Sequence, residues 1–260
     1  IESLRAIVDY NNAIEKINIP PKVEDLFLIH FKFLKEIHIS PMNKLYADIE
    51  GKMIVKKSYL ENDVYDILYE ATSDIKNVIV PSYIKTIRLF AFCNCKNIES
   101  FEFCENSQLE KIEGNAFQNS SITKMKIPDN VKLIGECSFY NSNLQEVEIP
   151  KNVEKIEDET FFNCQNLQTV IFADDSKLNS FGINSFASSS ITRIHIPKHV
   201  KIIGEKAFLE CYKLEEITFA EDSELQIIGC ESFLERILKA LLFQRMLNAY
   251  NHMHFIIVLV

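Results

Sequence analysis

Apolar positions recur along this chain with a period of about 23 residues. Each unit begins with a segment of the pattern L/I-x-x-I/V-x-I/F, such as IKNVIVP from Ile75 or LEEITFA from Leu214. The successive segments start 22–24 residues apart, at Ile75, Ile98, Ile122, Leu144, Leu167, Ile191 and Leu214. So regular a repeat predicts a solenoid, in which each unit buries its inner face against its neighbours.

The pattern inside each unit predicts a strand, a corner and a buried aromatic ring. The first, fourth and sixth residues of the segment point inward, and equivalent strands stack in parallel about 4.8 Å apart. A proline ends several of these strands because it cannot donate to the ladder, and glycines after the following V-x-x-I element suit a tight corner. One Phe per unit then predicts a column of stacked rings in the core: Phe92, Phe117, Phe139, Phe161, Phe186, Phe208 and Phe233.

Three units are two residues longer at the corner after the strand, where they read CENSQL, ADDSKL and AEDSEL. We expect these insertions to bulge outward without touching the core. The fold class predicted from the pattern is a mostly β, leucine-rich-repeat-like solenoid. It has a parallel concave sheet on one side and short turns or helical turns on the convex side.

The repeat divides the chain into four segments. Residues 75–235 hold seven regular repeats, and residues 1–39 hold degenerate copies such as IEKINIP from Ile14. Residues 40–74 interrupt the pattern, and Glu50-Gly51 between two apolar runs predicts a β-hairpin insertion. Residues 236–260 form an atypical tail.

Two interpretations of the tail stay open. Ile237 to Tyr250 keeps helical spacing of apolar residues, which suits a capping helix. Alternatively, the reading frame slipped near Arg236, and the tail encodes an eighth repeat in another frame. In that frame Met253-His254 can give only Ala, and Phe243-Gln244 gives only Pro or Ser, where the repeat has Ala and Pro.

These residues resemble a known family. The segment IPKHVKIIGEKAFLEC from Ile196 is similar to the BspA-type leucine-rich repeats, as is the hairpin segment SPMNKLYADIEGKMIVKKS from Ser40. The resemblance covers roughly residues 14–235. It implies a surface protein involved in adhesion, with no catalytic residues, although this chain carries no visible export or anchor segment. The chain begins at Ile1 rather than Met, which favours a fragment or a processed product.

Composition and charge narrow the possible partners. With a net charge of −9 the chain repels phosphate backbones, so we expect no nucleic-acid partner. No apolar run approaches the ~20 residues of a membrane-spanning helix.

Cys95, Cys164 and Cys211 share one repeat position with serines, which predicts buried thiols rather than disulfides or a zinc site. His195 and His199 lie on a strand and a corner, so we expect no metal or cofactor there.

The second, third and fifth residues of each strand point outward, and we interpret this face as the candidate protein-binding face. The residues selected are Lys76, Glu99, Glu102, Lys124, Lys126, Glu146, Glu148, Thr169, Arg193, His195 and Glu216. The face is mixed in sign and poor in aromatic residues, so an ordinary solvated surface is the alternative. The partner expected is a host or matrix protein for an adhesin, or an intracellular protein for a scaffold or for a regulatory module of a longer enzyme.

Overall fold

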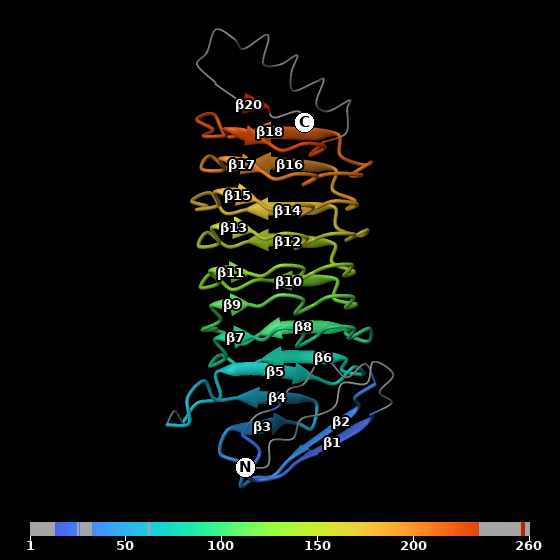
Figure 1. The fold of residues 1–260 in the computed structure, drawn as a ribbon, viewed down its shortest axis with the longest axis vertical. Helices are drawn as coiled ribbons and strands as arrows, with labels where there is room; N and C mark the ends of the chain where they lie inside the picture. Colours follow the sequence, from blue (N-terminus) through green and yellow to red (C-terminus); the bar gives the residue numbers. More distant parts are fainter. Residues whose placement is uncertain (1–13, 25, 27–32, 62, 234–255, 258–260) are drawn as a thin grey trace.

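Repeated strands stack in chain order into a solenoid, shown in the computed structural model of Figure 1. The structure describes residues 14–24, 26, 33–61, 63–233 and 256–257. The turns that carry β1 to β4 lie at one end of the stack and those with β18 and β19 at the other. The predicted solenoid is therefore confirmed, and the described residues contain no helix.

The L-x-x-I-x-I segments form the longer strands of the solenoid. Their side chains alternate between exposed and buried, as in β12, where Glu146 and Glu148 are exposed and Val147 and Ile149 are buried. Equivalent strands pair in parallel. The long strands are β1 (Lys16–Ile19), β2 (Glu36–Ile39), β6 (Asn77–Val80), β8 (Ser100–Phe103), β10 (Lys124–Lys126), β12 (Glu146–Ile149), β14 (Thr169–Phe172), β16 (Arg193–Ile196) and β18 (Glu216–Phe219).

The V-x-x-I elements on the opposite side form strands of two residues, each with one exposed or half-buried and one buried side chain. We expected turns or helical turns on this side. Turns are present, but the described residues also pair here in two parallel groups, with a break between Ile134 and Lys155, instead of forming helical turns. The short strands are β7 (Thr86–Ile87), β9 (Lys111–Ile112), β11 (Leu133–Ile134), β13 (Lys155–Ile156), β15 (Ser180–Phe181), β17 (Ile202–Ile203) and β19 (Ile227–Ile228).

The long strands do not make one continuous ladder. Their hydrogen-bonded groups are β1–β2, β6–β8, β10–β12–β14 and β16–β18. Within the regular repeats the breaks follow β8 and β14, the two strands whose corners are two residues longer and lead into another long strand. Phe103 and Phe172 end these strands half-exposed, where shorter units bury Val or Ile. The breaks in the ladder thus coincide with the longer corners, whose residues Glu105, Asn106, Asp174 and Asp175 are exposed, as expected of corners that bulge outward.

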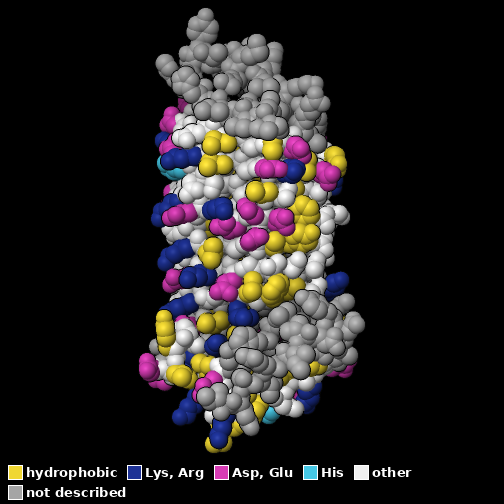
Figure 2. Space-filling view, in the orientation of Figure 1, with side chains coloured by type: hydrophobic (Ala, Val, Ile, Leu, Met, Phe, Trp, Pro, Cys, Tyr) yellow, Lys and Arg dark blue, Asp and Glu magenta, His cyan; other side chains and the backbone are white. Residues whose placement is uncertain are grey.

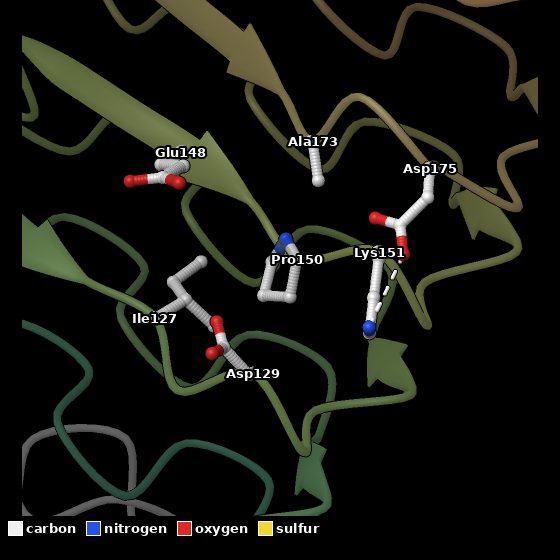
Figure 3. Close-up of a pocket in the computed structure, with 7 residues that line it drawn as sticks. All are labelled: Ile127, Asp129, Glu148, Pro150, Lys151, Ala173 and Asp175. Carbon is white, nitrogen blue, oxygen red and sulfur yellow. Dashed lines mark hydrogen bonds and ion pairs between the residues drawn. The ribbon is translucent and has the colours of Figure 1, made fainter.

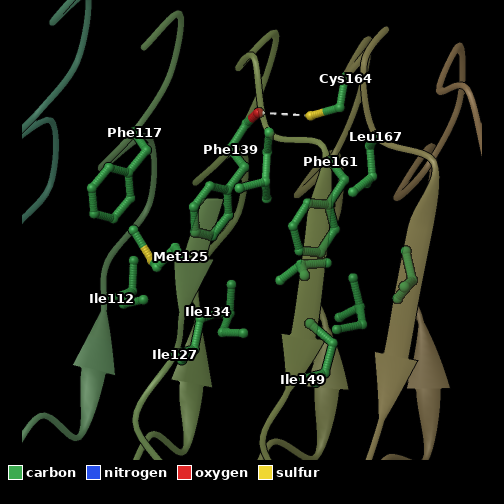
Figure 4. Packing of buried hydrophobic residues seen from close by; sticks show 14 of the residues in the cluster. Ile112, Phe117, Met125, Ile127, Ile134, Phe139, Ile149, Phe161, Cys164 and Leu167 are labelled. Atoms are coloured by element: carbon green, nitrogen blue, oxygen red, sulfur yellow. Dashed lines mark hydrogen bonds between the residues drawn. The ribbon is translucent and has the colours of Figure 1, made fainter. Parts of the chain in front are cut away.

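The predicted column of phenylalanine rings is confirmed (Figure 4). Neighbouring rings from Phe92 to Phe233 lie 5.1–5.4 Å apart between centroids, with planes inclined by 2–11°. Every ring of the column is buried, and Val, Ile and Leu from both sheets surround it. Full burial of one such side chain contributes roughly 1.5–3 kcal/mol, so the column accounts for much of the core.

The corner glycines serve close packing and not an unusual backbone angle. Gly135, Gly182, Gly204 and Gly229 have no positive φ. A Cβ on each would instead stand 2.4–2.6 Å or, for Gly204, 2.7 Å from the preceding turn. Successive turns therefore approach so closely here that no side chain fits between them.

Asparagine occupies one corner position of left-handed backbone in four successive turns. Asn94, Asn119, Asn141 and Asn163 have φ of 54–56°, a region that Asn tolerates better than most residues. Their side-chain amides form a ladder along the stack, with N···O distances of 3.1, 2.7 and 2.8 Å. The ladder links four successive turns on the outside of the corner.

An antiparallel hairpin lies between the N-terminal strands and the regular repeats. Strand β3 (Tyr46–Ile49) pairs with β4 (Met53–Lys56), and β4 pairs with β5 (Ile67–Ala71). Both Glu50 and Gly51 have positive φ, as primed hairpin turns require. Strand β5 also pairs in parallel with β7, so the hairpin continues into the first group of short strands, β7, β9 and β11. The boundaries of the segment, residues 40–74, remain a prediction.

The tail is described only at β20 (Ile256–Ile257), whose backbone pairs in parallel with β19. The proposed capping helix and most of the proposed frame-shifted repeat lie outside the described residues. In the part of the chain that is described, no helix has the length and apolar character needed to cross a membrane.

Candidate functional site

All eleven residues selected from the sequence are exposed, on or beside the long strands. Nine of them share one face because side chains at alternate positions of a strand point to the same side of a sheet, and Lys76 and Glu99 stand immediately before β6 and β8. We call this surface the long-strand face. The side of the molecule in Figure 2 carries acidic and basic side chains intermixed along its length, without a large block of one sign.

Several charges on the long-strand face are neutralised by the next turn. The Lys76 amine lies 2.8 Å from the carboxylate of Glu99, which joins the turns of β6 and β8. Arg193 on β16 lies 3.4 Å from Glu216 on β18, and His195 hydrogen-bonds Thr218 at 2.9 Å. Exposed pairs of this kind contribute about 0–1 kcal/mol each.

The centre of the face differs from these flanks. Lys124 and Lys126 on β10 are in register with Glu146 and Glu148 on β12. Within the described residues, neither lysine lies within 4 Å of any carboxylate oxygen. These four residues are called the central charge cluster below. They line a hollow of about 340 Å³ together with the buried side chains of Phe101 and Met125. The hollow lies beside the break between β8 and β10.

A second hollow, of about 240 Å³, lies beyond the ends of β10, β12 and β14 (Figure 3). The 3.1 Å ion pair between Lys151 and Asp175 closes one side of it. A matching pair, Lys198 and Asp222, joins the equivalent corners two turns further along, at 3.6 Å. We did not select these residues from the sequence. The available signal was a Pro-Lys corner followed by a long corner that contains Asp.

The shared cysteine position is not a reactive site. Cys95, Cys164 and Cys211 are buried free thiols, which confirms the prediction. The Cys164 thiol donates to the carbonyl of Phe139 at 3.0 Å, a contact drawn in Figure 4. Burial raises the pKa of Cys164 to about 11, so this thiol stays protonated at neutral pH and is a poor nucleophile.

The two histidines that were considered as metal ligands point to different partners. His195 bonds Thr218, whereas His199 lies 2.9 Å from Glu224 at the corner of the next turn. Among the described residues, no group of three or more His, Cys, Asp or Glu side chains is arranged to hold a metal ion.

One kind of repeat accounts for the period of about 23 residues, for the positions of proline and phenylalanine, and for the rows of strands on both sides of the core. The family described as BspA type Leucine rich repeat region matches the chain in six copies, over residues 62–178 and 132–256. This chain belongs to the BspA-type leucine-rich repeat family. No curated protein matches it.

Solved structures of bacterial leucine-rich repeat proteins share this fold. A leucine rich cell surface protein from Faecalibacterium prausnitzii is 27% identical with a TM-score of 0.54, over 66% of this chain and 46% of that protein. A leucine-rich repeat protein from Eubacterium ventriosum is 20% identical with a TM-score of 0.55, over 86% of this chain and 53% of that protein. The BspA-type chain thus spans about half the length of these relatives.

Proposed function

We propose that this chain is a non-catalytic protein-binding module, of the surface-antigen or adhesin type, whose long-strand face contacts a host or matrix protein. One observation carries the proposal. The central charge cluster presents two lysines and two glutamates beside a hollow with an apolar floor, and none of the four takes part in an ion pair within the described residues.

The arrangement suits binding better than catalysis. Interfaces combine an apolar centre with polar groups around it, as Phe101 and Met125 do below the charged side chains. Acid–base catalysis generally uses carboxylates that their surroundings desolvate, whereas Glu146 and Glu148 stand on an exposed sheet face. The cell-surface name of the relative from Faecalibacterium prausnitzii supports the adhesin interpretation.

The test measures capture of the purified chain by immobilised fibronectin, laminin and collagen, by surface plasmon resonance. We expect Lys124→Glu with Lys126→Glu to weaken capture about tenfold or more, because removing complementary charges at an interface weakens binding. The matched control is Lys85→Glu with Lys111→Glu. It makes the same change in net charge at exposed positions on or beside the short strands.

The control variant should bind as the wild type does. If both double variants bind every matrix protein equally well, the long-strand face is not the binding surface. If the wild-type chain is captured by none of the three proteins, the matrix-adhesin function is refuted.

A further inference from the structure

We propose that the long-strand face also pairs with the same face of a second copy of this chain. The two copies are related by a two-fold axis that runs parallel to the strands, between β10 and β12. The inference rests on the proposed function, because it requires the long-strand face to be a protein-binding surface, and it names one partner of that surface.

The central charge cluster is complementary to itself under this rotation. Its lysines are on one strand and its glutamates on the next, and each lysine is in register with one glutamate. A half-turn about an axis parallel to the strands exchanges β10 with β12 and keeps the register. Lys124 of one copy then faces Glu146 of the other, and Lys126 faces Glu148. Because a two-fold interface repeats each contact, four ion pairs form.

Two other simple arrangements bring like charges together. A half-turn about the long axis of the solenoid places each strand opposite itself, so lysines face lysines and glutamates face glutamates. A strand-parallel axis between β12 and β14 places Lys124 opposite Arg193 and Lys126 opposite His195. A seam between β10 and β12 avoids both conflicts.

The flanking strands are compatible with the same axis. The rotation places β8 opposite β14, where Glu102 meets Ile171, and β6 opposite β16, where Asn77 meets Arg193. Ile79 then lies opposite His195, and Ile79 and Ile171 are exposed in the single chain, at 60% and 44%. No two like charges face each other among the outward residues from β6 to β16.

The area also fits a dimer of modest affinity. The strands from β6 to β16 are spaced by about 4.8 Å and present about six residues each, which makes a face of roughly 29 by 20 Å. Two such faces bury roughly 1,100–1,200 Å² in total, at the lower limit of specific interfaces. The ion pairs lie beside the axis and join side chains that are exposed in the single chain, so pairing weakens with salt, for which the screening length is about 10 Å at 0.1 M.

The test is sedimentation velocity of the full 260-residue chain over a range of concentrations at low and high ionic strength. One variant carries Lys124→Glu and Lys126→Glu, and a second carries Glu146→Lys and Glu148→Lys. Each reversal turns four attractive contacts into repulsive ones, so each variant alone should associate on the order of a hundredfold more weakly.

Two further samples separate a lost contact from a damaged fold. An equimolar mixture of the two variants should form a heterodimer, because the all-acidic face of one is complementary to the all-basic face of the other. A variant with all four substitutions should dimerise like the wild type, because the seam is reversed but stays complementary.

A wild-type chain that stays monomeric at every concentration overturns the inference, and so does a dimer that persists in each double variant alone. These results are distinct from a failure of the proposed function. A monomer that is still captured by matrix protein refutes only the self-pairing. A dimer that captures none of the three matrix proteins refutes the adhesin function and leaves the pairing intact.

Discussion

Replacing Phe139 by alanine tests whether the column of rings stabilises the solenoid. Phe139 is fully buried inside the column, with a ring on each side. Its ring stacks on Phe117 at 5.1 Å and on Phe161 at 5.3 Å between centroids. The substitution therefore removes a buried aromatic side chain and both of its stacking contacts, and it leaves a gap between two turns.

The expected loss of stability is about 3–5 kcal/mol, the usual cost of truncating a buried Phe. Phe139→Leu keeps most of the apolar contact but removes the two ring–ring contacts, worth about 0.5–1.5 kcal/mol each. We expect this variant to lose about 1–3 kcal/mol. The control is Ile79→Ala, at a position that is 60% exposed, which should change stability by less than about 0.5 kcal/mol.

The free energy of unfolding is measured by urea titration with far-ultraviolet circular dichroism, since the chain has no Trp to report by fluorescence. Tyrosine fluorescence provides a second probe, and coincident curves justify two-state treatment. A loss below about 1 kcal/mol for Phe139→Ala would refute the reasoning. So would a loss no greater than that of the exposed control.

Two further predictions concern the corners and the buried thiols. Gly204→Ala should lower the free energy of unfolding, measured by urea titration, by at least about 1–3 kcal/mol, because its Cβ would stand 2.7 Å from backbone of the preceding turn. The control Gly114→Ala, whose Cβ would have its closest contact at 3.0 Å, should cost less. Equal costs would contradict the close-packing argument. Because burial raises the pKa of Cys164 from 9.0 to about 11, the folded chain keeps this proton between those pH values while the unfolded chain releases it. The free energy of unfolding should therefore fall in this pH range by up to about 1.4 kcal/mol for each unit by which the pH rises. Cys164→Ser should make this decline less steep. Parallel curves of stability against pH for the two proteins would show that the thiol does not contribute.

The core was predictable because it obeys a strict period. Each inward position is constrained by identical neighbours on both sides, so a single alignment of the units located the strands and the ring column. The corner chemistry was harder to interpret. Glycine and asparagine both occur in corners, but only coordinates separate a residue that must be small, such as Gly204, from one that must adopt positive φ, such as Asn141.

The exposed face was located correctly, but its internal differences were not. The pattern of alternate residues predicted which side chains point outward, because that depends only on strand geometry. It gave no sign that Lys76 and Glu99 would join across turns while Lys124 and Glu146 would stay apart. Such pairing depends on the local spacing of strands and on side-chain rotamers, which a repeat pattern does not encode.

Corner length offers a physical reason for the position of both hollows. A solenoid of identical turns has a uniform outer surface, so a hollow in that surface requires turns that differ from their neighbours. The hollow beside the central charge cluster adjoins the break after β8, and the second hollow includes Ala173 and Asp175 from the long corner after β14. Both therefore adjoin a repeat with the two-residue insertion. The outward strand residues determine the charge of the face, whereas the corner insertions determine where the surface is hollowed.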